Sequence, residues 1–174
     1  EQVHGIDVAD EQNLLVKADA STSIKSRVVC AVMTAECLPV LFCHRNGRGV
    51  AAAHAGWRGL ASGVIEAAAT RLCQQLNCPA NELLVWLGPA IGSQAFEVGS
   101  EVRDTFISVD AVAEQAFIAS PNRPEHYLAD IYSLARQALR RIGIEAVYGG
   151  ERCTYTEEEY FFSFRRNATT GRMA

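Results

Sequence analysis

The sequence predicts a single domain of mixed α/β (α+β) class, a layered sandwich of mixed sheets flanked by helices. Short strand-like runs bounded by Gly, Pro or polar residues alternate with amphipathic helical stretches along all 174 residues. No tandem repeat, low-complexity stretch or long linker divides the chain, whose length is typical of one domain. A composition of 49% hydrophobic and 21% charged residues is enough to form a buried core.

Six apolar runs predict strands, because each is short and is bounded by turn-forming or polar residues. They cover residues 28–33, 39–43, 50–54, 83–87, 146–148 and 160–164. Between the second and third runs, Asn46-Gly47 indicates a hairpin, and His44 is expected in its turn. His126, close to two prolines, is expected in a loop.

Three stretches predict helices. From Leu60 the apolar positions recur at helical spacing as far as Leu76, and Pro79 limits this helix. A second helix is expected over 101–109. The third covers 131–142, where Asp130 caps the start and Gly143 ends the helix.

Charge and composition narrow the class of partner and the location. A net charge of −4 and a pI near 5.6 give no reason to expect nucleic acid or an anionic membrane as partner. The chain has no apolar run of membrane-spanning length and no visible signal peptide, and its six cysteines are interpreted as reduced thiols. The expected location is therefore the cytoplasm. The sequence leaves the oligomeric state open.

Three segments place a potential metal ligand at a strand end or turn. They are Gln2-Val3-His4-Gly5, Thr34-Ala35-Glu36-Cys37-Leu38-Pro39-Val40 and Ala53-His54-Ala55-Gly56-Trp57-Arg58-Gly59. Two imidazoles and one thiolate suit zinc, and three protein ligands leave a fourth position for water or substrate. The hypothesis is a single zinc ion held by His4, Cys37 and His54, with a bound water of lowered pKa as the reactive group.

Spacing alone leaves other interpretations open. Cys37 is also compatible with a small buried hydrophobic residue, His54 with a core histidine bonded to the backbone, and His4 with a solvated side chain. Cys37 and His54 can also form the nucleophile–base pair of a metal-free cysteine hydrolase. Glu36 disfavours that pair, because a neighbouring carboxylate raises the pKa of a thiol.

Motifs along nearly the whole chain resemble the YfiH-like family, whose members are also labelled laccase-domain or multicopper polyphenol oxidase proteins. Besides the three segments above, the resemblance includes Ala18-Asp19-Ala20, Leu-Gly-Pro-Ala-Ile-Gly at 87–92, Phe96-Glu97-Val98-Gly99, Asp130-Ile131-Tyr132, Cys153-Thr154-Tyr155 and Phe162-Ser163-Phe164-Arg165-Arg166.

The resemblance implies that His4, Cys37 and His54 are metal ligands. It also implies purine nucleoside chemistry, namely phosphorolysis of adenosine or inosine and zinc-dependent deamination of adenosine. Glu36, Cys37 and Arg58 are then the expected catalytic residues, with Arg58 holding a phosphate or a ribose-linked oxygen. The expected small-molecule partners are a purine nucleoside and phosphate.

Two further activities are implied by the same resemblance. One is copper-dependent oxidation of phenols, although a three-copper cluster needs more imidazoles than the four histidines of this chain supply. The other is a role of bacterial members in editing cell-wall precursors.

The chain departs from the family pattern in two respects. Glu36 stands where the family usually has Asp, which moves the carboxylate outward by about one bond length. The whole chain, 1–174, is further expected to be one metal-binding domain without the family's N-terminal segment and its last C-terminal residues.

Overall fold

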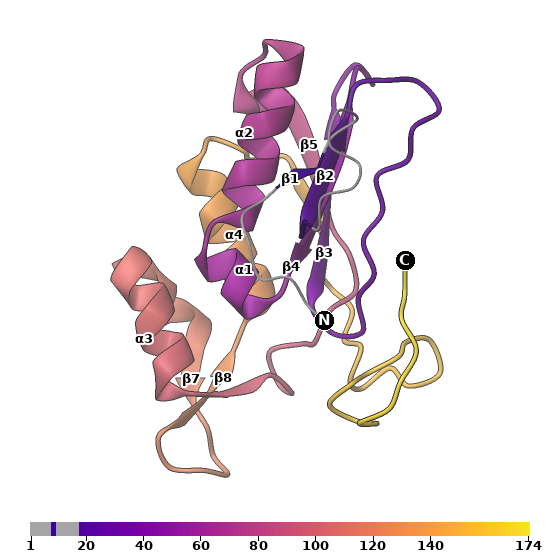
Figure 1. Ribbon diagram of the computed structural model, residues 1–174. Helices are drawn as coiled ribbons and strands as arrows, with labels where there is room; N and C mark the ends of the chain where they lie inside the picture. Colours follow the sequence, from indigo (N-terminus) through magenta and orange to yellow (C-terminus); the bar gives the residue numbers. More distant parts are fainter. Residues whose placement is uncertain (1–7, 10–17) are drawn as a thin grey trace.

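The computed structural model describes residues 8–9 and 18–174, and its main feature is a six-stranded sheet (Figure 1). The strands lie in the order β1 (Val8–Ala9), β2 (Ala20–Ser23), β4 (Val50–Ala55), β3 (Leu38–His44), β5 (Leu83–Leu87) and β9 (Val147–Gly149). Strand β1 pairs parallel with β2, and β5 pairs parallel with β9, while the remaining pairs are antiparallel. The sheet is therefore mixed, as the sequence predicts.

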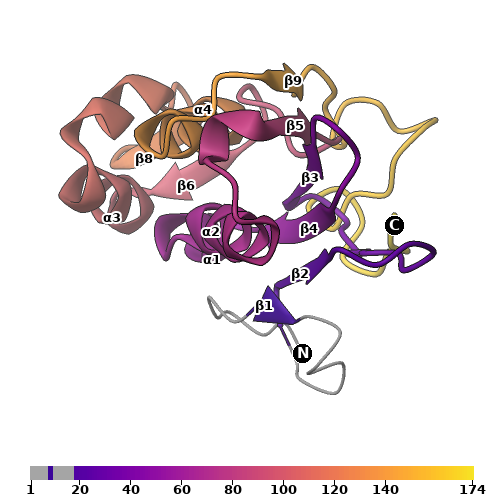
Figure 2. The same cartoon turned by 90° about the horizontal axis from the view of Figure 1, so that it is seen from above.

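Helices cover one face of this sheet (Figure 2). They are α1 (Trp57–Ala61), α2 (Val64–Leu76) and α4 (Ile131–Arg141). Side chains alternate across a strand, so every second residue of β3 points at the helices. Leu38, Val40 and Phe42 are buried in one cluster with Ile65 and Leu72 of α2. The core thus lies between the sheet and its helices.

A smaller unit extends one end of the molecule. It contains a three-stranded antiparallel sheet in the order β6 (Glu97–Gly99), β8 (His126–Ala129) and β7 (Phe117–Ala119). Helix α3 (Ser100–Val109) and the short 3₁₀ helix η2 (Ala111–Ala116) pack beside it, and a second 3₁₀ helix, η1 (Ala80–Glu82), precedes β5. Among the described residues, no helix is both long and apolar enough to cross a bilayer.

The predicted mixed α/β class is confirmed, and so are most of the predicted elements. The strands expected over 39–43, 50–54 and 83–87 correspond to β3, β4 and β5, and the one expected at 146–148 is displaced by one residue. Asp130 caps α4 as predicted. The long helix expected from Leu60 is divided, because Gly63 has a φ of +87° and separates α1 from α2.

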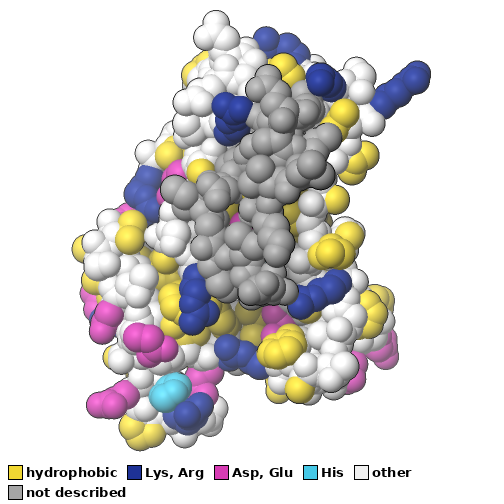
Figure 3. Space-filling view, in the orientation of Figure 1, with side chains coloured by type: hydrophobic (Ala, Val, Ile, Leu, Met, Phe, Trp, Pro, Cys, Tyr) yellow, Lys and Arg dark blue, Asp and Glu magenta, His cyan; other side chains and the backbone are white. Residues whose placement is uncertain are grey.

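Two strand predictions are wrong. Residues 28–33 and 160–164 form no strand. Their apolar side chains lie beside the sheet face that the helices leave uncovered, where Val29, Leu41 and Trp86 line one cavity of about 630 Å³. Hydrophobic side chains also reach the surface around the C-terminal segment (Figure 3), where Phe162 and Phe164 are exposed. Most of these apolar side chains, among them Val29 and Met33, are exposed, so an apolar run by itself did not indicate a paired strand.

Two histidines lie elsewhere than predicted. His126 begins β8 and is not in a loop. His44 is the last residue of β3, before the hairpin turn, and is fully buried.

Candidate metal centre

Strand pairing brings Cys37 and His54 to the same end of the large sheet. In the β3–β4 hairpin, Leu38 is opposite Ala55 and Pro39 is opposite His54. Cys37, directly before β3, therefore meets the chain where it leaves β4 at Gly56. A Cβ atom placed on Gly56 would lie 3.1 Å from Cys37 Sγ and 3.9 Å from His54 Cε1. Both side chains thus converge on Gly56, whose lack of a side chain leaves room for them.

The ring of His54 is buried and is oriented by Asp19. His54 Nδ1 lies 3.1 Å from Asp19 Oδ1, and the two side chains are only 10% and 8% exposed. The backbone N–H of His54 also donates to the Asp19 carbonyl, at 2.7 Å. A carboxylate accepts hydrogen bonds, so the proton of the neutral ring resides on Nδ1. This leaves the lone pair on Nε2.

His54 Nε2 is a buried nitrogen with no hydrogen-bond partner among the described residues. Buried polar atoms are nearly always paired, so an exception calls for a ligand or a functional role. An imidazole that donates Nδ1–H to a carboxylate and keeps Nε2 bare has the usual arrangement of a metal-ligating histidine.

Arg58 follows this centre closely in the chain, as the second residue of α1. Its side chain is exposed, and its guanidinium group lies 4.2 Å from the centroid of the Trp57 ring. Gly56 is the N-cap residue of the same helix, which directly follows His54 and Ala55 at the end of β4. Because only three residues separate Arg58 from His54, Arg58 stays near the end of β4, and its charged group faces solvent.

The carboxylate of Glu36 is engaged by the C-terminal segment. Ser163 Oγ donates to Glu36 Oε1 at 2.5 Å, and the Arg165 backbone N–H donates to Glu36 Oε2 at 2.8 Å. The Glu36 carbonyl accepts from the Ile91 N–H at 3.0 Å. Glu36 thus ties residues 163–165 to the strand end that carries Cys37.

The structure brings together two of the three predicted ligands. His4 lies outside the described residues. Sequence reasoning assigned no role to Asp19 or Ser163. The one signal for each was its place in a motif shared with the YfiH-like family, Ala18-Asp19-Ala20 for Asp19 and Phe162-Ser163-Phe164 for Ser163.

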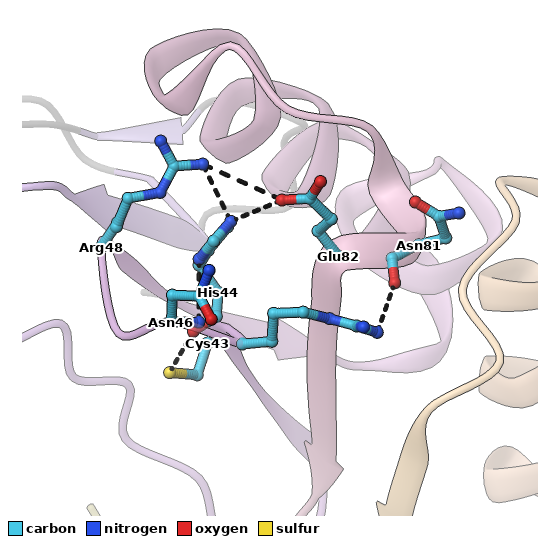
Figure 4. Close-up of polar contacts among 7 residues, drawn as sticks. Cys43, His44, Asn46, Arg48, Asn81 and Glu82 are labelled. Carbon is cyan, nitrogen blue, oxygen red and sulfur yellow. Dashed lines mark hydrogen bonds and ion pairs between the residues drawn. The ribbon is translucent and has the colours of Figure 1, made fainter.

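A separate group of potential ligands lies at the opposite end of β3. His44, Cys78 and Glu82 place one donor atom each within 4.8 Å of one another, the single such cluster among the described residues. Figure 4 shows His44 and Glu82 facing each other between the β3–β4 hairpin and the start of β5. From the sequence, His44 was predicted to lie in a turn, and Cys78 was interpreted only as one of six reduced thiols.

Comparison with known proteins assigns the chain to a family. The family model described as multi-copper polyphenol oxidoreductase laccase matches residues 1–174. The chain belongs to this laccase family. The purine nucleoside phosphorylase YfiH of Escherichia coli strain K12 is 58% identical over 180 residues, which cover 100% of the chain and 70% of that protein. The resemblance to the YfiH-like family is thereby confirmed.

Two further relatives of this laccase-family chain support the assignment. A purine nucleoside phosphorylase of Pseudomonas aeruginosa is 53% identical over 175 residues, covering 100% of the chain and 70% of that protein. The crystal structure of a Neisseria meningitidis protein superposes with a TM-score of 0.91 at 46% identity, covering 98% of the chain and 69% of that protein. The fold described above is thus the fold of this solved relative.

Proposed function

We propose that the chain is a zinc-dependent purine nucleoside enzyme, which cleaves adenosine and inosine with phosphate and also deaminates adenosine. The observation that supports the metal dependence is the buried Nε2 of His54 beside Cys37, which has no hydrogen-bond partner in the part of the chain that the structure describes. The substrate class is supported by the relatives of Escherichia coli and Pseudomonas aeruginosa, which are named purine nucleoside phosphorylases.

The side chains present fit a metal ion of the zinc class. Imidazole nitrogen and thiolate sulfur are preferred zinc donors, and Asp19 holds the His54 ring in the tautomer that ligation requires. In this proposal His4 is the third ligand, and a fourth position stays open for water or substrate. Zinc bound there would supply Lewis-acid chemistry, lowering the pKa of water or polarising a substrate oxygen.

In phosphorolysis, a phosphate oxygen forms a bond to C1′ of the ribose while the bond from C1′ to the purine nitrogen breaks. The base leaves with the electron pair of that bond and takes up a proton. In the proposal, Arg58 binds phosphate, because a guanidinium group offers several donors in a plane that matches phosphate oxygens. Its position over Trp57 limits how far the charge can move.

Glu36 has a positioning role in the same proposal. Both of its carboxylate oxygens accept hydrogen bonds from the segment 163–165. This holds the segment beside Cys37 as one wall of the site. A side chain so engaged is better suited to fixing geometry than to carrying a proton.

Copper-dependent oxidation of phenols is the alternative that the family's description suggests. A laccase needs a three-copper cluster besides its blue copper site, and hence more imidazoles than the four in the sequence. Pro39 of β3 lies opposite His54, and His44 is five residues further along the same strand. At about 3.3 Å per residue, His44 is therefore roughly 17 Å from the position opposite His54. The distribution of histidines therefore favours a single ion at the His54 centre over a three-copper cluster.

The proposed function is tested by supplying the purified protein with zinc, phosphate and either adenosine or inosine, and separating the products. Free base and ribose phosphate report phosphorolysis, and inosine formed from adenosine reports deamination. His54→Ala is expected to lose turnover and the zinc ion bound at this centre, whereas the control His126→Ala, changed on β8, keeps both.

Three outcomes contradict parts of the proposal. Release of neither base nor inosine rules out the nucleoside activities and favours a binding role toward cell-wall precursors. Turnover that persists in metal-free protein together with a covalent acyl adduct on Cys37 indicates a cysteine hydrolase. Oxidation of phenols by copper-loaded protein with blue absorbance supports the laccase-type activity.

A further inference from the structure

The end of the large sheet far from His54 brings three metal-binding side chains together from separate parts of the chain. His44 ends β3, Cys78 follows helix α2, and Glu82 ends η1 just before β5. Their donor atoms all lie within 4.8 Å of one another. His44 is fully buried, and the other two are partly buried. We propose that His44, Cys78 and Glu82 form a second divalent-metal site, of the zinc class, independent of the centre at His54.

Backbone contacts fix this convergence. His44 pairs with Leu83 between β3 and β5, and the next N–H, of Arg45, donates to the Glu82 carbonyl at 2.9 Å. At the end of α2, Asn77 has a left-handed conformation and the Cys78 N–H donates to the Cys73 carbonyl at 3.1 Å. The three side chains therefore start from backbone positions set by the sheet and the helix cap, which lowers the entropic cost of assembling a site.

The donor set and its spacing match zinc. One imidazole, one thiolate and one carboxylate are all zinc ligands, with bond lengths of about 2.0–2.3 Å. In a tetrahedral site the donor atoms then lie roughly 3.3–3.8 Å apart. Atoms already within 4.8 Å need to move by no more than roughly 1 Å to reach these separations. The fourth position would be open to water.

Two hydrogen bonds of His44 must change when the metal binds. Asn46 N–H donates to His44 Nδ1 at 3.0 Å, and His44 Nε2 lies 2.9 Å from Glu82 Oε2 (Figure 4). Ligation through Nε2 requires the proton to move to Nδ1, so the Asn46 contact is lost. Asn46 is exposed in the hairpin turn, so water can take the place of this bond to its N–H.

Arg48 is the group that opposes a cation here. Its Nη2 lies 3.0 Å from His44 Nε2 and 3.9 Å from Glu82 Oε2, as Figure 4 shows. The Arg48 side chain is 50% exposed, so it can turn toward solvent when an ion arrives. This competition gives the proposal a specific consequence, because removal of the Arg48 charge must strengthen metal binding.

The proposal is tested by equilibrium dialysis with zinc alone in a Cys37→Ser background, which removes one ligand of the centre at His54. This protein is expected to bind one zinc ion. Adding Cys78→Ser is expected to weaken that binding by about 100-fold, and adding Glu82→Gln by about tenfold, while adding Arg48→Ala strengthens it several-fold. His44 is left unchanged, because its burial makes misfolding of a variant a competing explanation.

Cys73→Ser is the matched control, since Cys73 is a neighbouring thiol on α2 that lies outside the three-residue cluster. It is expected to bind zinc as the parent does. Circular dichroism of each variant checks folding, and cobalt substitution gives a thiolate-to-metal absorption band that Cys78→Ser abolishes. The proposal is overturned if the Cys37→Ser protein binds no zinc. It is also overturned if Cys73→Ser weakens binding as much as Cys78→Ser, or if Arg48→Ala leaves binding unchanged.

Discussion

At the scale of single residues, the Asp19–His54 contact decides which ring nitrogen is left for a ligand. Asp19→Asn removes the negative charge that supports Nδ1–H but retains an oxygen acceptor. Loss of such an outer partner typically weakens metal binding by about 10–100-fold. We expect that loss for zinc at His54, measured by competition with a chelator. Asp104→Asn, at a carboxylate that is 66% exposed, is the control, and equal affinity in both variants would contradict the role given to Asp19.

The cysteines differ in acidity for identifiable reasons. Burial raises the pKa of the Cys73 thiol to about 11, and the neighbouring Cys78 adds to this shift. Burial also raises the pKa of Cys153, but hydrogen bonds from Thr156 and from the backbone at Gly92 and Tyr155 outweigh burial and leave it below its usual value. The thiolate of Cys153 is therefore stabilised, whereas that of Cys73 is not.

Alkylation with iodoacetamide tests this difference, because only the thiolate reacts. Near neutral pH, Cys153 is expected to react faster than Cys73. The Cys153 rate should level off at a pH below the ordinary thiol pKa, while the Cys73 rate keeps rising toward pH 11. Peptide mass spectrometry follows both sites in one sample, with Cys153→Ser to confirm the assignment. Equal rates for the two sites would show that exposure, rather than hydrogen bonding, governs reactivity.

The residues of the candidate site show how far sequence reasoning reaches. Cys37 and His54 could be selected because each stands at a strand end in a distinctive local motif. Their contacts could not be predicted, since Asp19 is 35 positions from His54 and Ser163 is 127 positions from Glu36. Such pairs depend on how strands and loops meet in space, which local patterns do not encode.

At the scale of elements, helix α4 shows a case in which local chemistry was sufficient. Asp130 accepts from the Ser133 N–H at 3.0 Å and from Ser133 Oγ at 2.8 Å, as an N-cap residue does. Asp130→Ala is expected to lower the free energy of unfolding by about 1 kcal/mol, measured by urea denaturation. Asp104→Ala, within the exposed face of α3, should change it much less. Equal effects would indicate that charge, rather than capping, matters.

The elements that were predicted wrongly have a common physical cause. Runs 28–33 and 160–164 have the apolar composition of strands, yet they form no strand, and side chains such as Val29 and Tyr160 are largely exposed beside the uncovered sheet face. A short apolar run reports hydrophobic composition and does not report whether the backbone joins a ladder. In contrast, the β3–β4 hairpin combines two apolar runs with Asn46-Gly47, so both pairing and turn were indicated.

At the scale of the whole molecule, the C-terminal residues 150–174 are an irregular layer over the sheet. They form no helix or strand, and specific polar contacts hold them. Arg166 donates to the carbonyls of Thr154 and Phe161 within the layer, and Arg165 Nη1 donates to the Glu97 carbonyl outside it. An isolated bridge joins Met173 to Thr34. The layer is thus attached beside the segment that carries Cys37.

Glu36 is the link that connects this layer to the candidate metal centre. Glu36→Ala removes the acceptors of two hydrogen bonds, one from Ser163 Oγ and one from the Arg165 N–H. Ser163 is fully buried. If the layer around residues 163–165 loses about 1–2 kcal/mol of local stability, it opens roughly 5–30-fold more often. We therefore expect the Arg165 amide to exchange its hydrogen faster by that factor, with little change in the amides of β5.

Glu158→Ala is the matched control, because Glu158 is a 73% exposed carboxylate of the same layer that pairs with Arg166 at 3.5 Å. An exposed pair contributes little, so exchange at Arg165 should stay within about twofold of the parent. If Glu36→Ala and Glu158→Ala raise exchange equally, the layer is held by charge in general. A positioning role for Glu36 requires that only Glu36→Ala raises exchange at Arg165 and that the same variant binds zinc at His54 more weakly. That result would show that residues 163–165 support the metal centre.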